Sequence, residues 1–444
     1  MTGATLITSA RPYNEDSADL LLREGRIVAV GQDLRTQAAE QIDEETTIVD
    51  ADGLIVLPGM VDLHAHLREP GREDAETVET GTRAAARGGF TAVHAMANSS
   101  PVADTAGVVE QVHRLGLESG WSEVYPVGAV TVGLAGEQLA ELGAMAESSA
   151  QVRMFSDDGR CVDNALLMRR AMEYVKSFGG FIAQHAQEPT LTAEAQMNEG
   201  EVSATLGLPG WPAVAEEAII ARDVLLAQHT GARLHICHVS TAGSVEIIRW
   251  AKDRGVAVTA EVTPHHLMLT DELITSYNPV YKVNPPLRTR HDVEALRQGL
   301  AEGVIDVVGT DHAPHPTQAK ECEWAQAAMG MTGLETALPV VQQAMISTGL
   351  MDWRRFAEVT SVRPAEIYGH QHQGRPLQAQ EPANLILVDP GAGGAIAPEQ
   401  HASKGRNSPF GGLELPGRVQ YTFLAGHMTT AQGELATSRT GRTA

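Results

Sequence analysis

Residues 60–68 read Met-Val-Asp-Leu-His-Ala-His-Leu-Arg, an apolar strand pattern that carries two histidines and an arginine at alternate positions. Side chains two residues apart on a strand share a face, so His64, His66 and Arg68 are predicted to converge. Imidazole is a common metal ligand, and a guanidinium can hold a carboxylate through two hydrogen bonds. Pro-Gly turns bound the stretch on both sides, which disfavours the alternative of two ordinary surface histidines. We expect a metal site with an anion clamp beside it.

Short segments rich in Val, Ile and Ala alternate with longer helical stretches through the middle of the chain. Repeated alternation of strands and helices predicts a mainly parallel sheet, either open or closed. In barrel enzymes the chemistry gathers at the carboxyl ends of the strands. The residues that follow apolar runs here are His66, His185, His238 and Asp311. This placement favours an α/β fold with a (β/α)8 TIM-type barrel, over residues 58–374.

Both ends of the chain have a different texture, with short apolar runs separated by glycine and charged turns. Such runs predict short strands. We therefore expect a small β-sandwich domain formed by both termini, residues 1–57 and 375–444, beside the barrel.

Composition excludes several classes of protein. The formal net charge of −23 over 444 residues argues against nucleic acid or an anionic membrane as a partner. No apolar run is long enough to span a bilayer and no signal peptide is evident, so a cytoplasmic location is expected. Cys161, Cys237 and Cys322 are too widely spaced for a clustered-cysteine zinc site. Metal binding must then rest on histidine and carboxylate.

Several short motifs occur in an order that resembles one family. His64-x-His66, two later lone histidines and a final aspartate are similar to the ligand set of the amidohydrolase superfamily. The run His64-Ala65-His66-Leu67-Arg68-Glu69-Pro70-Gly71 resembles the dihydroorotases of the long, first class. Further matching segments are Phe155–Gly159, His235–Ser240, Val262–Leu267, Val283–Arg288, Gly309–His315 and Gly333–Ala337. Each motif is weak alone, but their joint order over nearly the whole chain makes accident very improbable.

The resemblance implies two divalent ions, usually Zn²⁺, at the top of the barrel. It assigns His64 and His66 to one ion, His185 and His238 to the other, and Asp158 as the bridge. Many amidohydrolases bridge the metals with a carbamylated lysine, but the segment Phe155–Gly159 has no lysine and carries two aspartates. Bridging by Asp158 is what the resemblance to one branch of the family implies. Asp157 is the adjacent competitor, and strand alternation means that the two should not both face the metals. A plain turn before Gly159 is the remaining alternative.

Hydrolysis of a cyclic amide at neutral pH requires hydroxide, and a bound metal lowers the pKa of water from about 15.7 toward about 7. A carboxyl group must then move a proton from the nucleophile to the departing nitrogen. Asp311, close to the ligand set, is the candidate for this acid/base role and is also counted among the metal ligands.

Substrate recognition rests on other positions. The resemblance implies that Arg68 and Asn98 hold the carboxylate of dihydroorotate, with His66 beside them. It further implies contacts to the substrate from Asn284 and His315, and closure of the Met329-Gly330 backbone over the ring. The family's usual proline before that asparagine is replaced by Ala97.

The stretch Pro316–Ala328 is consistent with a mobile lid or with a plain surface loop. His235, three residues before His238, is expected on the opposite side of its strand and packed under helices. His265 and His266 are expected to give structural support, whereas His94, His291, His370 and His372 carry no signal.

Three functions follow from these observations. The first is an active dihydroorotase that interconverts N-carbamoyl-L-aspartate and L-dihydroorotate in pyrimidine biosynthesis. The second is a hydantoinase or allantoinase; Arg68 disfavours it, because a hydantoin has no carboxylate to hold. The third is a non-catalytic scaffold for aspartate transcarbamoylase, disfavoured because every expected ligand is present. A homodimer and a transcarbamoylase are the protein partners that the resemblance implies.

Overall fold

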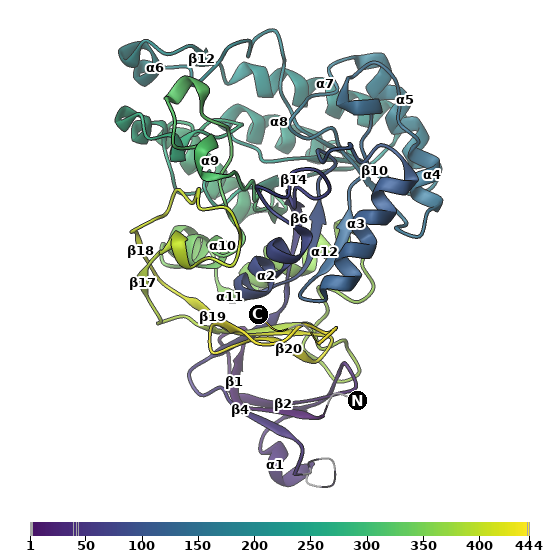
Figure 1. Ribbon diagram of the computed structural model, residues 1–444, viewed down its shortest axis with the longest axis vertical. Coiled ribbons are helices and arrows are strands. Elements are labelled where there is room, and N and C mark those ends of the chain that lie inside the picture. The colour runs from purple at the N-terminus through teal and green to yellow at the C-terminus, as the bar shows by residue number, and fades with distance from the viewer. Residues whose placement is uncertain (1–2, 39, 41, 43, 442, 444) are drawn as a thin grey trace.

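Eight parallel strands close into a barrel in the computed structural model, which describes residues 3–38, 40, 42, 44–441 and 443 (Figure 1). Two hydrogen-bonded sheets, β6-β7-β8 and β9-β10-β13-β14-β15, contribute the strands. Parallel bridges between Gly128 and Phe155 and between Ala65 and His312 join the two sheets into one cylinder. The barrel strands are β6 (Met60–Ala65), β7 (Phe90–Ala95), β8 (Glu123–Pro126), β9 (Met154–Phe155), β10 (Phe181–Gln184), β13 (Leu234–Ile236), β14 (Val258–Val262) and β15 (Val307–Val308).

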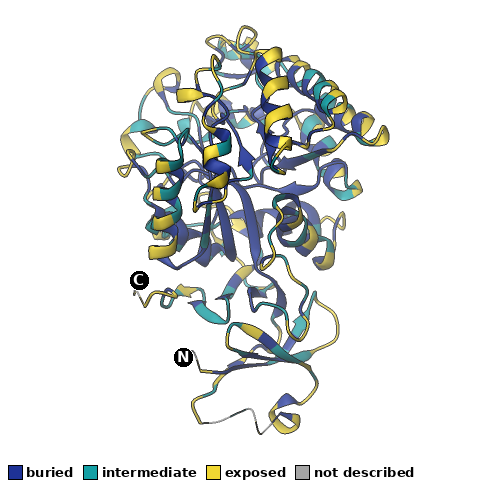
Figure 2. Ribbon diagram, turned by 90° about the vertical axis from the view of Figure 1, so that its right-hand side faces the viewer, coloured by how far each residue is buried: buried dark blue, intermediate teal, exposed yellow. Residues whose placement is uncertain are grey.

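Helices cover the outside of the barrel, as the strand-helix alternation predicts. Figure 2 shows buried strands surrounded by helices whose outer faces are exposed. The helices are α2 (Val78–Gly88), α3 (Ala106–Ser119), α4 (Leu142–Glu147), α5 (Ala165–Lys176), α6 (Glu201–Leu206), α7 (Val214–Thr230), α8 (Ala242–Asp253), α9 (Arg290–Glu302), α10 (Ala337–Val341), α11 (Trp353–Ala357) and α12 (Arg363–Tyr368). Turns η7 (Gln342–Ile346) and η8 (Glu358–Val362) are π-helical. Shorter elements are η2 (Val132–Leu134), η3 (Asp271–Ser276), η4 (Pro279–Tyr281), η5 (Thr317–Ala319), η6 (Trp324–Gln326), η9 (Pro398–Gln400), β11 (Met197–Asn198) and β12 (Gly210–Trp211).

Local sequence explains where these helices begin and end. Thr77 accepts a hydrogen bond from the backbone of Thr80 at the start of α2, and Thr289 caps α9 in the same way from Asp292. Such caps satisfy amides that have no partner inside the helix. The helix α2 ends at Gly89, whose φ of 92° is accessible to glycine at little cost.

Both termini form a small β domain below the barrel (Figure 1). Its main sheet runs in the order β21-β20-β19-β16-β5-β1-β2-β3, with β4 paired to β1. A bulge in β1 lets its first half pair with β4 and its second half with β5. The strands are β1 (Thr5–Pro12), β2 (Ala18–Arg23), β3 (Arg26–Gly31), β4 (Thr47–Asp50), β5 (Ile55–Pro58), β16 (Leu385–Asp389), β19 (Arg418–Leu424), β20 (His427–Ala431) and β21 (Glu434–Leu435), and α1 (Leu34–Gln37) packs beside them.

Alternation along β16 couples the two parts of the molecule. Leu385 and Leu387 pack inside the β domain with Phe423, whereas Ile386 and Val388 join the large core that includes barrel residues. Since successive side chains of a strand point to opposite faces, one strand supplies both cores. The β domain therefore packs against the end of the barrel at which the strands begin.

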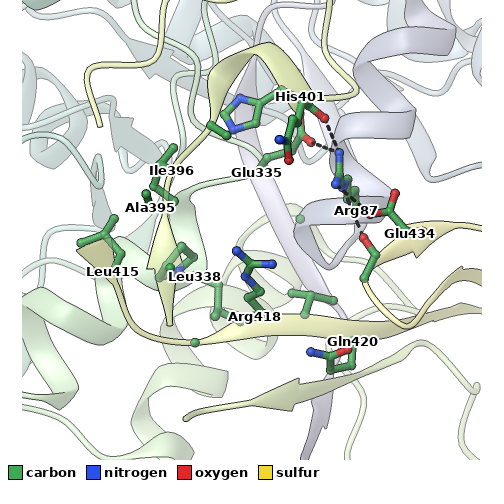
Figure 3. Close-up of a pocket in the computed structure, with 18 of the residues that line it drawn as sticks. Arg87, Glu335, Leu338, Ala395, Ile396, His401, Leu415, Arg418, Gln420 and Glu434 are labelled. Carbon is green, nitrogen blue, oxygen red and sulfur yellow. Dashed lines mark hydrogen bonds and ion pairs between the residues drawn. The ribbon is translucent and has the colours of Figure 1, made fainter. Parts of the chain in front are cut away.

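Part of the C-terminal segment leaves the β domain and crosses the side of the barrel, through β17 (Gly394–Ala395) and β18 (Glu414–Leu415). Here the Glu335 carboxylate accepts hydrogen bonds from the amides of Ala402 (3.0 Å) and Ser403 (3.2 Å). Figure 3 shows the cavity of about 180 Å³ beside this contact, with Arg87 and Glu335 on its wall. The contact brings residues beyond 400 to the side of the barrel, next to the loops at its mouth. Across the described residues, no helix is both long enough and apolar enough to cross a membrane.

Candidate active site

Six side chains from five strand ends meet at the carboxyl-terminal mouth of the barrel. We call this group the rim cluster: His64, His66, Asp158, His185, His238 and Asp311. Asp158 lies at its centre, with its oxygens 3.2 Å from His185 Nδ1, 3.2 Å from His238 Nε2 and 3.3 Å from His66 Nε2. All six residues are buried. The structure therefore brings together every residue that sequence predicted as a metal ligand.

The first two histidines lie on either side of the end of β6. His64 Nε2 is 3.4 Å from Asp158 Oδ1 and 3.6 Å from Asp311 Oδ1. His66 Nε2 is 3.0 Å from Asp311 Oδ1. Each ring uses its Nδ1 for a separate oriented contact, at 2.5 Å to Glu261 and 2.8 Å to Asn98. Both Nε2 atoms are thereby directed toward the two aspartates.

Asp157 and Asp158 have opposite environments. Asp157 Oδ1 accepts hydrogen bonds from the amides of Val130 (2.8 Å) and Thr131 (3.0 Å), and its other oxygen is bonded by the Thr131 hydroxyl. These contacts tie it to the loop that follows β8. Asp158 faces the imidazoles instead, as the motif comparison suggested.

Glu261 is a residue of the site that sequence reasoning missed. It lies on β14, accepts from His64 Nδ1 at 2.5 Å and contacts His235 Nε2 at 3.2 Å. A carboxylate that orients a ligand imidazole fixes its tautomer and raises its basicity. The available signal was a glutamate inside the apolar run of residues 258–262, which is expensive to bury without a partner.

The predicted position of His235 was wrong. His235 contacts Glu261 and the ring of Phe181 in the interior of the barrel, and it does not pack under the helices. Alternation failed because β13 ends at Ile236 and His238 has a φ of 32°, so the two histidines are not on one regular strand. Its ring nitrogens contact Thr259 and Glu261, so it lies outside the rim cluster.

Three residues of the site adopt left-handed backbone conformations: Arg68 (φ 63°), His238 (φ 32°) and Asp311 (φ 44°). Such conformations cost about 1–3 kcal/mol for residues other than glycine, and they persist only where surrounding contacts enforce them. Near Asp311, the Asp62 carboxylate accepts from the amide and the hydroxyl of Thr310, at 3.0 and 2.5 Å. Buried contacts between β6 and the residues that follow β15 thus hold the strained turn that presents Asp311.

The carboxylates of the rim cluster and the imidazoles of His64 and His185 stabilise each other's charged forms, whereas burial and the nearby Arg68 lower the pKa of His66. Burial alone would raise the pKa of Asp158, but the facing imidazoles outweigh it and hold that pKa well below its usual range. The same balance lowers the pKa of Asp311 to about 2. Burial would lower the pKa of His64, yet Asp158 and Glu261 raise it well above its usual value. Two ionised carboxylates this close together favour a bound cation between them.

The donor set fits divalent metal ions. Two overlapping triads, His64-His66-Asp311 and His64-Asp158-His238, each have ligand atoms within 4.8 Å of one another. The buried His64 Nε2 makes no hydrogen bond to any described residue, as expected of an atom reserved for a metal. A third triad joins His64 and Glu261 to Cys237, but burial raises the pKa of that thiol and keeps it protonated. The fitting groups are therefore imidazole and carboxylate.

Arg68 and Asn98 lie beside the rim cluster. Arg68 Nε donates to the Pro314 carbonyl at 3.2 Å, and no described carboxylate forms an ion pair with its guanidinium. Burial lowers the pKa of Arg68 only to about 10, so it remains charged at neutral pH. The Asn98 oxygen accepts from His66 Nδ1, which leaves the amide NH₂ to donate to a ligand.

Asn284 and His315 come from two loops on the other side of the mouth. Asn284 Nδ2 donates to Gln187 Oε1 at 3.2 Å, while its buried Oδ1 has no partner among the described residues. Gln187 Oε1 also contacts His185 Nε2 at 2.8 Å. Burial lowers the pKa of His315 to about 3, and its Nε2 donates to the Met329 carbonyl at 2.8 Å. Sequence gave no sign of Gln187 as the link to the rim cluster.

Met329 and Gly330 form a tightly held turn. Gly330 has a φ of 143°, and a Cβ there would lie 2.7 Å from His315 Nε2, so only glycine fits. Its amide donates to the Lys282 carbonyl at 3.0 Å. The preceding stretch, residues 316–328, contains η5 and η6, and its Trp324 is buried beside Met197.

The other histidines separate into two groups. His266 contacts Thr263 and the Pro285 and Pro286 carbonyls, which agrees with structural support. His265 is buried, and its Nε2 has no hydrogen-bond partner in the part of the chain that the structure describes. His291 and His372 are exposed.

Comparison with known proteins agrees with this site. A family model described as dihydro-orotase-like matches residues 53–244. A dihydroorotase of Streptomyces coelicolor is 64% identical over 431 residues, covering 97% of this chain and 99% of its own. One of Mycobacterium tuberculosis is 53% identical over 433 residues, covering 97% and 99%.

Solved structures show the same fold at lower identity. The L-hydantoinase of Arthrobacter aurescens, also called a dihydropyrimidinase, has a TM-score of 0.86 at 24% identity and covers 98% of both chains. A dihydropyrimidinase of Brevibacillus agri has a TM-score of 0.83 at 21% identity, covering 97% and 96%. Identities this low support the barrel architecture alone, whereas the full-length relatives decide the family. The chain belongs to the dihydroorotase family.

Proposed function

We propose that the chain catalyses the reversible interconversion of L-dihydroorotate and N-carbamoyl-L-aspartate, a step of pyrimidine biosynthesis. The observation that carries this proposal is a charged Arg68, without a carboxylate partner, beside a cluster suited to metal-assisted hydrolysis. A cyclic amide that carries a carboxylate would pair its carboxylate with Arg68 and place its ring amide at the rim cluster.

Arg68 and the Asn98 amide bind the substrate carboxylate in this proposal. Charge-assisted hydrogen bonds of this type are roughly twice as strong as neutral ones. The unpartnered Asn284 Oδ1 accepts a ring N–H, because a buried acceptor without a donor is costly. His315 holds the Met329 carbonyl and with it the turn that closes over the ring.

Two divalent metal ions, most simply Zn²⁺, complete the site. His64, His66 and Asp311 would hold one, His185 and His238 would hold the other, and Asp158 would be shared between them. Bound metals of this kind supply hydroxide at neutral pH and polarise a carbonyl oxygen. Glu261 and Asn98 orient the ligand imidazoles through their Nδ1 atoms.

Asp311 moves the proton. In the hydrolytic direction its carboxylate accepts a proton from the attacking water, the ring carbon–nitrogen bond breaks, and the protonated carboxyl returns the proton to the departing nitrogen. In the biosynthetic direction the same carboxylate accepts the proton from the attacking nitrogen and returns it to the departing hydroxide, which leaves as water. Its low pKa favours the carboxylate form that begins hydrolysis.

One assay separates this function from the other two candidates. The purified chain, loaded with zinc, is tested on dihydroorotate, hydantoin and allantoin. Turnover of dihydroorotate alone supports the proposal, preference for hydantoin or allantoin supports the second candidate, and no turnover supports the scaffold. Arg68→Met sharpens the test: losing a charged hydrogen bond worth about 1.5–3 kcal/mol should lower kcat/KM for dihydroorotate roughly 10- to 150-fold.

Metal analysis tests the bridge. Asp158→Ala is expected to lose one or both ions when the purified protein is analysed by atomic emission. Asp157→Ala is the matched control, since its carboxylate bonds to the loop of Val130 and Thr131. Unchanged metal content in Asp158→Ala would transfer the bridging role to its neighbour.

The remaining expectations belong to the same proposal. We assign the catalytic barrel to residues 58–374 and the β domain to 1–57 with 375–444. The family resemblance supports a cytoplasmic homodimer and, as a second partner, the aspartate transcarbamoylase whose product is this substrate. Sedimentation of the purified chain, alone and mixed with that transcarbamoylase, tests both associations.

A further inference from the structure

Lys320 is a buried lysine that no carboxylate neutralises among the described residues. Its Nζ donates to three backbone carbonyls, those of Lys282 at 3.0 Å, Ala328 at 2.8 Å and Gly330 at 3.0 Å. An ammonium group has three N–H donors, so all of them are used. Burying such a charge is costly unless every donor is satisfied. Burial and the nearby Lys282 lower the pKa of Lys320 to about 7.

The three carbonyls belong to the two backbone segments that flank the predicted substrate pocket. Lys282 lies two residues before Asn284, and Ala328 and Gly330 enclose Met329. The Gly330 amide also bonds to the Lys282 carbonyl, and Asn407 Nδ2 adds a second donor at 3.0 Å to the Gly330 carbonyl. One ammonium group therefore connects the loop of Asn284 to the turn of Met329 and Gly330.

We propose that Lys320 is a positioning residue for substrate binding, which sets the distance between the Asn284 loop and the Met329-Gly330 turn. The proposal rests on the function proposed above and extends it to a residue that contacts neither substrate nor metal ligands. Binding and catalysis require the substrate to be held to within a fraction of an ångström. A shift of the residues that support the binding groups therefore lowers both the affinity and the rate.

Lys282 provides a matched control. It too is buried, and its Nζ donates to the carbonyls of Trp324 (2.7 Å) and Ala325 (3.2 Å) in the same 316–328 stretch. Its ammonium group does not reach Met329 or Gly330. Removing either amino group should loosen this stretch, but only the loss of Lys320 should disturb the substrate-binding turn.

The experiment compares the kinetics of Lys320→Met, Lys320→Gln and Lys282→Met with those of the parent enzyme, all loaded with zinc. We expect Lys320→Met to raise KM for dihydroorotate roughly 10- to 100-fold with a smaller change in kcat and with unchanged metal content. Lys320→Gln, whose amide keeps two donors, should fall between it and the parent. Lys282→Met should raise KM less than about threefold, well below the range that misplaced substrate groups produce.

Two outcomes overturn the proposal: a parental KM in the Lys320 variants, or an equal rise in Lys282→Met. If Lys320→Met does not fold, the KM of Lys320→Gln is compared with that of Lys282→Met in the same way. Hydrogen exchange provides a readout that needs no substrate. Protection of residues 329–331 should fall in the Lys320 variants and stay parental in Lys282→Met, so positioning is tested even if the parent does not turn over dihydroorotate.

Discussion

Two clusters of histidines lie within the same barrel and differ in the groups that surround the rings. The rim cluster places imidazoles against carboxylates at the carboxyl ends of the strands. The second group, which we call the inner cluster, consists of His94, Tyr125, Tyr368 and His370. Its rings pack with centroids 4.4 Å apart for His94 and Tyr368 and 4.3 Å apart for Tyr125 and His370. The inner cluster lies toward the strand starts, where α12 packs on β6 and β7.

The contrast between the two clusters shows that the groups around an imidazole decide whether it is charged or neutral. In the rim cluster, Asp158 raises the pKa of His185 against the effect of burial. In the inner cluster, burial lowers the pKa of His94 to about 4 and that of His370 to about 2, so both rings are neutral at physiological pH. Neutral rings packed on tyrosines fill space, whereas rings that face ionised carboxylates form a site for cations.

The largest expected effect is at Asp311. Asp311→Asn removes the proton acceptor and should lower kcat for dihydroorotate hydrolysis by about 10²- to 10⁴-fold. Steady-state rates measured together with metal content check this. A variant that keeps both its metal and its rate would contradict the acid/base assignment and weaken the contrast between the clusters.

Glu261→Gln tests whether the second partner of a rim imidazole matters. Loss of the carboxylate on His64 Nδ1 should weaken metal affinity by about 10- to 100-fold, as removal of such outer partners typically does. Competition with a chelator measures the affinity. His94→Phe serves as the control, because it removes a buried polar contact in the same barrel without touching the rim cluster. Equal affinities for Glu261→Gln and the parent would contradict the orienting role.

The inner cluster should be dispensable for chemistry. His94→Phe loses two hydrogen bonds, from Nδ1 to the Asp62 carbonyl (2.7 Å) and between Nε2 and His370 Nε2 (3.1 Å), and is expected to cost about 1–3 kcal/mol in the free energy of unfolding. The rate and the metal content should match the parent. Urea unfolding followed by an activity assay checks both, and a large drop in kcat would mean that the two clusters are coupled.

The final prediction concerns pH and needs no loss of a contact. His94 and His370 titrate near 6.5 when unfolded and lower when folded, so below pH 6.5 the unfolded chain binds more protons. Their contribution to stability is complete above pH 6.5 and declines as the pH falls toward 4. Urea unfolding of the metal-free chain and of a His94→Phe/His370→Phe variant at pH 7.5, 6 and 5 should show the parent losing stability relative to the variant as the pH falls. Identical slopes would place the acid sensitivity elsewhere.

Local patterns in the chain determined the parallel barrel, the β domain at the termini and the residues of the rim cluster. Strand ends follow from apolar runs, and the carboxyl ends of parallel strands must meet at one mouth, so His66, His185, His238 and Asp311 were predictable as neighbours. The choice of family rested on the joint order of motifs, since the His-x-His start occurs in other cyclic amidohydrolases as well.

Only the folded chain decided the contacts between residues far apart in sequence. Asp158 rather than Asp157 faces the imidazoles because the amides of Val130 and Thr131 bind the other carboxylate. His235 and His238 both face the interior, because the left-handed backbone of His238 interrupts the strand alternation between them. Glu261 and Lys320 gained their roles from partners on distant loops. Sequence periodicity predicts on which face of a helix or strand a side chain lies. The partner of a buried charge depends instead on which groups the whole fold brings within hydrogen-bonding distance.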